Sequence, residues 1–167
     1  MSPSDPDQSA LRATYIDIER GGTGLRTLRA LRTGEVLSPF TARRTLSEPG
    51  RHTVQVGIDA HIELDPQDLA FIDHSCDPNA AFDVDRMVVV ALRDVAPGDP
   101  LTFFYPSTEW RMATPFSCHC GSARCVGEVR GAAFLDRATL LTYSLFGVVR
   151  VALLESGDRA SENAQAM

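Results

Sequence analysis

The four cysteines are the residues of this chain whose types and spacing indicate chemistry most directly. Cys76 stands alone in the stretch Phe71–Asn79, and the other three follow later as C-x-C-x4-C, namely Cys118, Cys120 and Cys125. Four thiolates grouped in this way are typical of one tetrahedral zinc site. Two disulfides, or four unrelated buried thiols, are the alternatives.

The compartment in which the protein resides helps to decide between zinc-bound thiolates and disulfides. The first ten residues contain several Asp, Ser and Pro residues and no apolar segment of the kind that signal peptides carry. We therefore expect an intracellular protein, cytoplasmic, or nuclear in a eukaryote. Because disulfides are rare in those compartments, zinc-bound thiolates are favoured over disulfides.

Length and charge limit the kind of protein that holds these cysteines. With 167 residues, of which 44% are hydrophobic, the chain fits one globular domain, and a monomer is expected. A net charge of -6 argues against nucleic acid as a direct partner, since binding to phosphates requires basic patches. A cationic substrate is electrostatically easier, although an acidic surface also simply promotes solubility. All 16 basic residues are arginine, so the chain contains no lysine.

Up to residue 105, the elements expected to position the candidate site are short strands. Alternating or β-branched runs predict strands, which are Thr14–Glu19, two within His52–Leu64, Met87–Leu92 and Leu101–Tyr105. The segment Pro39–Gly50 is rich in breakers and is interpreted as a surface connection. Many short strands with few helices indicate a mainly β fold.

The end of the chain has a different pattern. Apolar residues recur at helical spacing in Ala133–Glu155, which predicts one or two helices. Arg137 and Arg150 interrupt the apolar run, so packing against the core is favoured over a membrane span, and no membrane partner is expected. From Ser156 onward small polar residues predict a disordered tail.

Four ordered groups of residues carry a resemblance to a known family. They are Gly22–Leu25 with Thr33–Val36, Phe71–Asn79, Ala91–Gly98 followed by Leu101–Tyr105, and Phe116–Cys125 with Gly127 and Gly131. On these motifs the chain resembles the SET-domain methyltransferases that have a post-SET zinc-binding segment, in a small form without a pre-SET region. The likeness covers roughly residues 14 to 131.

The resemblance implies a fold and a division of the chain. The fold would be a mainly β SET-domain β-clip with short helices, in which the strand at Phe71–His74 and the strand at Leu101–Tyr105 cross in a pseudoknot. The expected segments are a flexible N-terminus (1–13), the SET domain (14–109), the post-SET zinc-binding segment (110–131), a C-terminal helical extension (132–155) and the tail (156–167).

The same likeness implies S-adenosylmethionine as the cofactor. The residues at the matching cofactor-binding positions are Gly22, Thr23, Gly24, Leu25, Asp73, His74 and Phe116. Glycines suit such a site because a compact cofactor requires close approach of the backbone. His74 is interpreted as a buried structural histidine and not as a general base.

Tyr105 occupies the position of the family's catalytic tyrosine. Methyl transfer to a neutral amine mainly requires alignment and desolvation, which a phenol serves better than a carboxylate that would hold the amine protonated. Phe103 stands where the family has Phe or Tyr, and Phe implies room for di- or trimethylation. Phe104 and Trp110 are expected to line an aromatic substrate channel, with ordinary core packing as the alternative for Trp110.

The resemblance also joins Cys76 to the three later cysteines in one Zn²⁺ site that would fasten the late loop over the active site. His119 lies between two of these ligands and is expected to be a bystander, since four thiolates complete the tetrahedron.

Three departures from the family pattern bear on activity and substrate. Asp73 replaces the usual Asn and cannot donate a hydrogen bond as an amide does. Ala70 replaces the usual Arg, and the segment Phe40–Asp68, one wall of the substrate groove, is short. The expected function is methylation of a lysine amino group, in a protein or peptide or in free lysine or another small amine. The alternative is a catalytically silent SET-like module that binds zinc and a partner.

Overall fold

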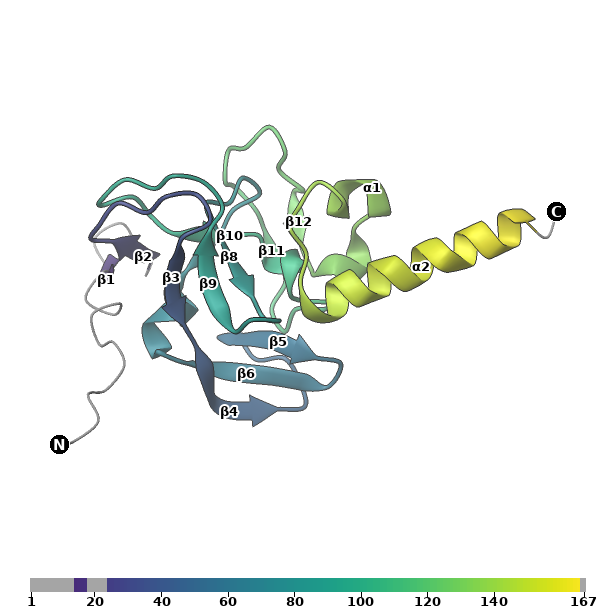
Figure 1. The fold of residues 1–167 in the computed structure, drawn as a ribbon, viewed down its shortest axis with the longest axis horizontal. Helices are drawn as coiled ribbons and strands as arrows, with labels where there is room; N and C mark the ends of the chain where they lie inside the picture. The colour runs from purple at the N-terminus through teal and green to yellow at the C-terminus, as the bar shows by residue number, and fades with distance from the viewer. Residues whose placement is uncertain (1–13, 18–23, 166–167) are drawn as a thin grey trace.

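The structure of the chain is a computed structural model that describes residues 14–17 and 24–165 (Figure 1). The segment at 1–13, predicted to be flexible, lies outside the described residues, as do Gly22 and Thr23. The predicted mainly β class with short helices is confirmed.

The centre of the fold is a three-stranded antiparallel sheet in the order β3-β9-β8. Its strands are β3 (Val36–Pro39), β8 (Ala80–Asp83) and β9 (Val88–Ala91). All four residues of β8 are buried, and Phe82 and Val89 belong to the largest apolar cluster. The continuous apolar run Met87–Leu92, predicted as a buried strand, contains β9, in which Val89 and Ala91 are buried and Val88 and Val90 are partly buried.

A second antiparallel sheet has the order β4-β6-β5. Its strands are β4 (Thr41–Leu46), β5 (Thr53–Gly57) and β6 (Ala60–Asp65). The hairpin β5–β6 contains the two strands predicted within His52–Leu64, but β4 corrects the interpretation of Pro39–Gly50 as a connection. β4 is an exposed edge strand with the sequence TARRTL, so it shows no apolar alternation, and only its pairing with β6 makes it a strand.

Three two-stranded pairs complete the β structure. They are β1 (Thr14–Asp17) with β2 (Gly24–Thr27), β7 (Asp73–His74) with β10 (Thr102–Phe103), and β11 (Phe116–Ser117) with β12 (Glu128–Val129). Among the pairs of the described residues, β7 and β10 are the ones that run in parallel, and they are the two segments expected to meet in the pseudoknot. β10 is shorter than predicted because Tyr105 already begins a 3-10 turn.

The remaining elements are short helices and one long one. They are η2 (Gln67–Phe71), η3 (Tyr105–Ser107), η4 (Ala132–Phe134), α1 (Arg137–Leu140) and α2 (Gly147–Gln165). α2 corrects the predicted disordered tail, because it continues through Ser156 to Gln165, and Figure 1 shows it projecting away from the body. Ala, Glu, Gln and Arg in this stretch favour helix once the first turns are fixed by packing. No helix in the described part of the chain is long and apolar enough to cross a membrane.

Candidate active site

The parallel pairing of β7 with β10 is the feature that assembles the site. His74 lies beside Phe103 in the register, and the backbone N–H of Ser75 donates to the carbonyl of Phe103 at 3.1 Å. An open cavity of about 670 Å³ lies against this pair. Its lining includes Asp73, His74, Phe103, Tyr105 and Phe116, so the crossing strands place most of the predicted site residues around one space.

Tyr105 begins η3 just after β10, and a hydrogen bond holds its hydroxyl in place. The Tyr105 hydroxyl donates to the carbonyl oxygen of Ile72 at 3.1 Å, and its ring contacts Phe103 with the centroids 4.6 Å apart. Burial, together with the carboxylates of Asp73 and Glu109, raises the pKa of the Tyr105 phenol above its ordinary value. Tyr105 is therefore a neutral phenol at physiological pH, and its oxygen has a lone pair free to accept a further hydrogen bond.

His74 joins the aromatic side chains of the site. Its ring centroid lies 5.1 Å from that of Tyr105, 5.6 Å from that of Phe116 and 5.7 Å from that of Phe104. Its Nδ1 accepts a hydrogen bond from the backbone N–H of Tyr105 at 3.3 Å. Burial lowers the pKa of His74 to about 4, so the ring is neutral and can accept this bond. These contacts support the prediction of a structural histidine that positions Tyr105.

The expected cofactor-binding residues are in part brought together. A β-carbon added at Gly24 would lie 2.9 Å from Oδ2 of Asp73, so this glycine leaves room for the Asp73 carboxylate. Asp73, His74 and Phe116 line the cavity, whereas the side chain of Leu25 is fully buried in the core. The donor and apolar groups present suit S-adenosylmethionine at this end of the cavity, where the Asp73 carboxylate would accept from its ammonium group and Phe116 would cover its adenine. Leu25 would then act through its backbone.

The predicted aromatic channel is corrected at two of its three positions. Phe103 lines the cavity, but neither Phe104 nor Trp110 is among the lining residues. Phe104 is buried on the other side of the chain and stacks on Tyr143, with the ring centroids 3.7 Å apart and the planes 7° from parallel. Successive side chains of an extended strand point to opposite faces, so Phe103 and Tyr105 share one face and Phe104 takes the other.

Trp110 lies outside the cavity lining, and its backbone makes two close contacts. Its N–H donates to the side-chain oxygen of Gln55 at 2.8 Å, and the exposed fraction of the residue is 36%. A β-carbon at Gly131 would lie 2.5 Å from the Trp110 carbonyl oxygen, and the φ of Gly131 is 114°. A glycine is therefore required where these two backbone segments touch.

Several cavity residues carry no sequence signal that marks them as functional. They include the aromatic side chain of Phe82 and the carboxyl group of Glu109. Glu109 lies one turn beyond Tyr105, and its backbone N–H donates to the Tyr105 carbonyl at 3.1 Å. The only hint in the sequence is that Glu109 follows Tyr105 by four positions. This spacing has no predictive value unless the turn η3 is known.

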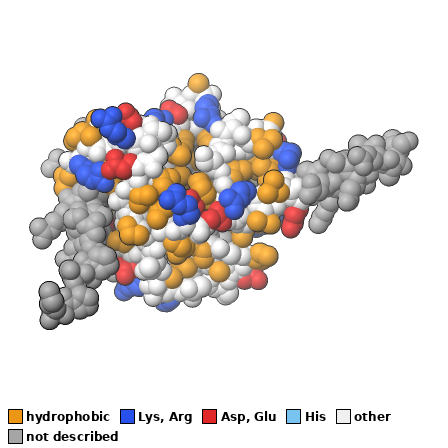
Figure 2. Space-filling view, viewed as in Figure 1, with side chains coloured by type: hydrophobic (Ala, Val, Ile, Leu, Met, Phe, Trp, Pro, Cys, Tyr) orange, Lys and Arg blue, Asp and Glu red, His pale blue; other side chains and the backbone are white. Residues whose placement is uncertain are grey.

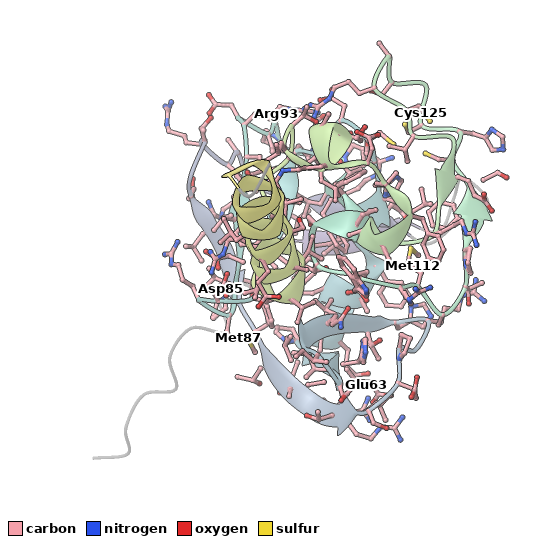
Figure 3. All side chains as sticks on the ribbon, turned by 90° about the vertical axis from the view of Figure 1, so that its right-hand side faces the viewer. Glu63, Asp85, Met87, Arg93, Met112 and Cys125 are labelled. Atoms are coloured by element: carbon pink, nitrogen blue, oxygen red, sulfur yellow. The ribbon has the colours of Figure 1, made fainter. Side chains whose placement is uncertain are left out.

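The four cysteines converge as predicted. Their sulfur atoms all lie within 4.8 Å of one another, and those of Cys76 and Cys118 are 3.9 Å apart. A tetrahedral zinc–thiolate site with Zn–S bonds of about 2.3 Å has sulfur–sulfur edges of about 3.8 Å, so this donor set fits Zn²⁺. The structure has all four as free thiols, and His119 is not part of the group. In Figure 3 several yellow sulfur atoms gather near the labelled Cys125.

The C-terminal segment is tied to the cysteine group. The hydroxyl of Tyr143 donates to the carbonyl oxygen of Cys76 at 2.9 Å, while its ring stacks on Phe104. The guanidinium of Arg124 lies 4.3 Å from the centre of the Tyr143 ring and donates to the carbonyl of Thr142 at 3.0 Å. The residues after the cysteines therefore brace the site from the side opposite to the cavity.

Comparison with known proteins identifies the family. The family model described as "SET domain" matches residues 22–106, which include β7, β10 and Tyr105. The chain belongs to the SET-domain family. A relative named methyltransferase flvH, from Aspergillus flavus, is 40% identical over 122 residues, which are 72% of this chain and 68% of flvH.

The chain is also similar to more distant relatives and to solved structures. A histone-lysine N-methyltransferase specific for H3 lysine-36, from Aspergillus oryzae, is 29% identical, and the match covers 78% of this chain but only 16% of that protein. Among solved structures, KRYPTONITE in complex with mCHH DNA, an H3(1-15) peptide and SAH matches with a TM-score of 0.51 and 18% identity. That match covers 69% of this chain and 28% of KRYPTONITE, and it confirms the predicted SET fold.

The family assignment also confirms the predicted enzyme class. This SET-domain protein is a methyltransferase that uses S-adenosylmethionine. The roles assigned to individual side chains, the zinc ion and the boundaries of the post-SET segment are proposals that rest on the geometry above.

Proposed function

We propose that this SET-domain protein transfers a methyl group from S-adenosylmethionine to the amino group of a lysine side chain or of a similar amine. The observation that carries the proposal is the cavity in which the fixed hydroxyl of Tyr105, the ring of Phe103 and the carboxyl of Asp73 meet. The relatives named as histone-lysine methyltransferases support lysine as the acceptor.

The residues of the cavity would align and desolvate the amine. The bound cofactor supplies a methyl group on a positively charged sulfur. Because the Tyr105 hydroxyl donates its own proton to the carbonyl of Ile72, its oxygen can accept an N–H of the incoming amine and aim the nitrogen lone pair. Transfer would join this nitrogen to the methyl carbon and would leave the electron pair of the broken S–C bond on the sulfur of the cofactor. The aromatic rings around Tyr105 exclude water from this step.

Phe103 supports more than one round of methylation. The exposed fraction of Phe103 is 7%, and its ring meets those of Phe82 and Tyr105 with centroid distances of 4.7 and 4.6 Å. A phenylalanine carries no hydroxyl to hold water beside the amine, so a methylated amine has room to turn for a second transfer. We therefore propose di- or trimethylated products.

The two substrate classes are distinguished by experiment. Purified protein is incubated with methyl-labelled S-adenosylmethionine and, separately, L-lysine, lysine-bearing peptides and core histones. Because the chain has no lysine, it cannot label its own side-chain amines. Label in L-lysine identifies a small-amine enzyme, and label only in peptides or histones identifies a protein methyltransferase.

Tyr105→Phe tests the role given to the hydroxyl. We expect transfer to fall about 100-fold or more, because the alignment of the nitrogen is lost, while binding of S-adenosylhomocysteine stays within about twofold. Unchanged transfer would remove Tyr105 from the reaction. No transfer by the wild-type protein to any of these amines, together with no cofactor binding by calorimetry, would instead favour the silent zinc-binding module.

A further inference from the structure

Glu109 is a buried carboxyl group that the reaction described above does not use. Its exposed fraction is 7%, and it lines the same cavity as Tyr105. Within residues 14–17 and 24–165 no arginine forms an ion pair with it. A buried carboxylate without a cation is costly, so such a group either takes up a proton or meets a charged partner.

The contacts of Glu109 fix one of its oxygens and leave the other for a ligand. Oε1 accepts from the backbone N–H of Gln55 at 2.7 Å and from the hydroxyl of Thr108 at 3.2 Å. A second hydrogen bond joins the same two segments, because the side-chain oxygen of Gln55 accepts from the backbone N–H of Trp110. No hydrogen bond to Oε2 is found among the described residues. The clamp between β5 and the loop after η3 therefore holds the carboxyl group in place before any ligand arrives.

We propose that Glu109 is the anionic anchor for the ammonium group of the substrate amine in this cavity. The inference rests on the proposed function and adds to it a residue that selects cationic substrates. An ammonium ion that donates to Oε2 completes the hydrogen bonding of the carboxylate and compensates its buried charge. An ionised carboxylate also favours the protonated amine, so the contact acts on binding. The ammonium group then gives its proton to water in the open cavity before methyl transfer, because only the neutral amine has a lone pair that can attack. Loss of this anchor is therefore expected to change KM more than kcat.

The pH dependence of binding offers a test on the unaltered protein. Burial raises the pKa of Glu109 to about 7. Glu109 is neutral below that pH and ionised above it, while an alkylamine with a pKa near about 10.4 stays an ammonium ion on both sides. Affinity for the amine should thus fall as the pH falls through about 7. The other charged or titratable side chains of the cavity are Arg51, His52, Asp73, His74, Tyr105 and His119, besides the cysteines.

The experiment compares Glu109→Gln with Glu63→Gln. The amide introduced by Glu109→Gln keeps an oxygen for the donors of Gln55 and Thr108 but has no charge, so the fold should be retained. Glu63 lies on β6, pairs with Arg44 at 2.6 Å and is absent from the cavity lining, which makes Glu63→Gln a matched control (Figure 3). Binding of n-butylamine and of neutral n-butanol to the protein with S-adenosylhomocysteine is measured from about pH 5.5 to 8.5, on either side of the pKa of Glu109. Thermal unfolding of each variant is followed in parallel.

We expect Glu109→Gln to weaken n-butylamine binding about tenfold at about pH 8, to abolish the change near pH 7 and to leave n-butanol binding unchanged. Glu109→Asp should recover part of the affinity. Equal amine affinity and an equal pH profile in wild-type protein and Glu109→Gln would overturn the inference. Because these are binding measurements, that result is distinct from an absence of methyl transfer, which would overturn the proposed function. Should Glu109→Gln not fold, a wild-type protein that binds the amine equally at both ends of the pH range overturns the inference by itself.

Discussion

At the scale of single residues, the site consists of side chains whose protonation is set by burial. Tyr105 stays a neutral phenol and His74 a neutral imidazole, so neither carries charge near the sulfonium of the cofactor. Two carboxyl groups of the cavity, those of Asp73 and Glu109, lie close enough to Tyr105 to help raise the pKa of its phenol, and Asp73 also lies next to Gly24. A reaction that moves a methyl group from a cation to a neutral amine is served by such an arrangement.

Asp73 is expected to bind the cofactor by charge. If its carboxylate meets the ammonium of S-adenosylmethionine, Asp73→Asn replaces a charge-assisted hydrogen bond with a neutral one and should weaken S-adenosylhomocysteine binding about fivefold. Calorimetry measures this, with Asp59→Asn in the exposed β5–β6 turn as the control. Tighter binding by Asp73→Asn would show that the amide of other SET domains suits this site better.

At the scale of elements, the loop between β11 and β12 is held in place by the four-cysteine group and by the C-terminal segment that contains Tyr143. Cys76 contributes from the strand crossing, and the backbone N–H of Val126 donates to its sulfur at 3.4 Å. Tyr143 stabilises this loop by its hydrogen bond to the Cys76 carbonyl and by stacking on Phe104. Because Cys118 and Cys120 also line the cavity, the order of this loop and the shape of the cavity are linked.

Metal content is predicted to control the stability of this loop. Cys125→Ser removes one thiolate, so bound zinc should fall well below one ion per chain, and the melting temperature and S-adenosylhomocysteine affinity should both drop. Elemental analysis and thermal unfolding measure the change, and His119→Ala is the control that should keep its zinc. Full zinc occupancy in Cys125→Ser would show that three cysteines and another group hold the ion.

At the scale of the whole molecule, two sheets and a braced loop surround one cavity, while α2 leaves the body. On the described part of the face in Figure 2, basic and acidic side chains are interspersed, so the net charge of -6 is not gathered there into one acidic surface. This face therefore offers no single acidic surface to a cationic substrate, whereas Glu109 places a buried carboxyl group inside the cavity.

Ending the chain after Ser156 should leave the enzyme stable and active. Among the α2 residues whose side chains the structure describes, 147–156, those that pack on the body are Val148, Val149 and Leu153, and Arg150 pairs with Asp85 at 3.2 Å. These contacts all precede the truncation point, so the melting temperature should change by less than about 2 °C. Thermal unfolding and the methyl-transfer assay test this. A larger loss of stability would mean that the last turns of α2 bind the body or a second chain.

The sequence by itself determined the features that depend on short stretches of chain. The cysteine spacing predicted a four-thiolate group, and the motifs around His74 and Tyr105 predicted the SET fold and the pair of crossing strands. These inferences succeed because each motif fixes its own local backbone, and four of them in order leave few folds to consider.

Only the tertiary structure decided which side chains face the cavity. Phe104 was expected in the channel but turns to Tyr143, and β4 is a strand only because β6 lies beside it. Glu109 enters the site through bonds to Gln55, a residue 54 positions away. No local pattern encodes such a contact, because the free energy that buries a carboxyl group comes from partners that are distant in sequence.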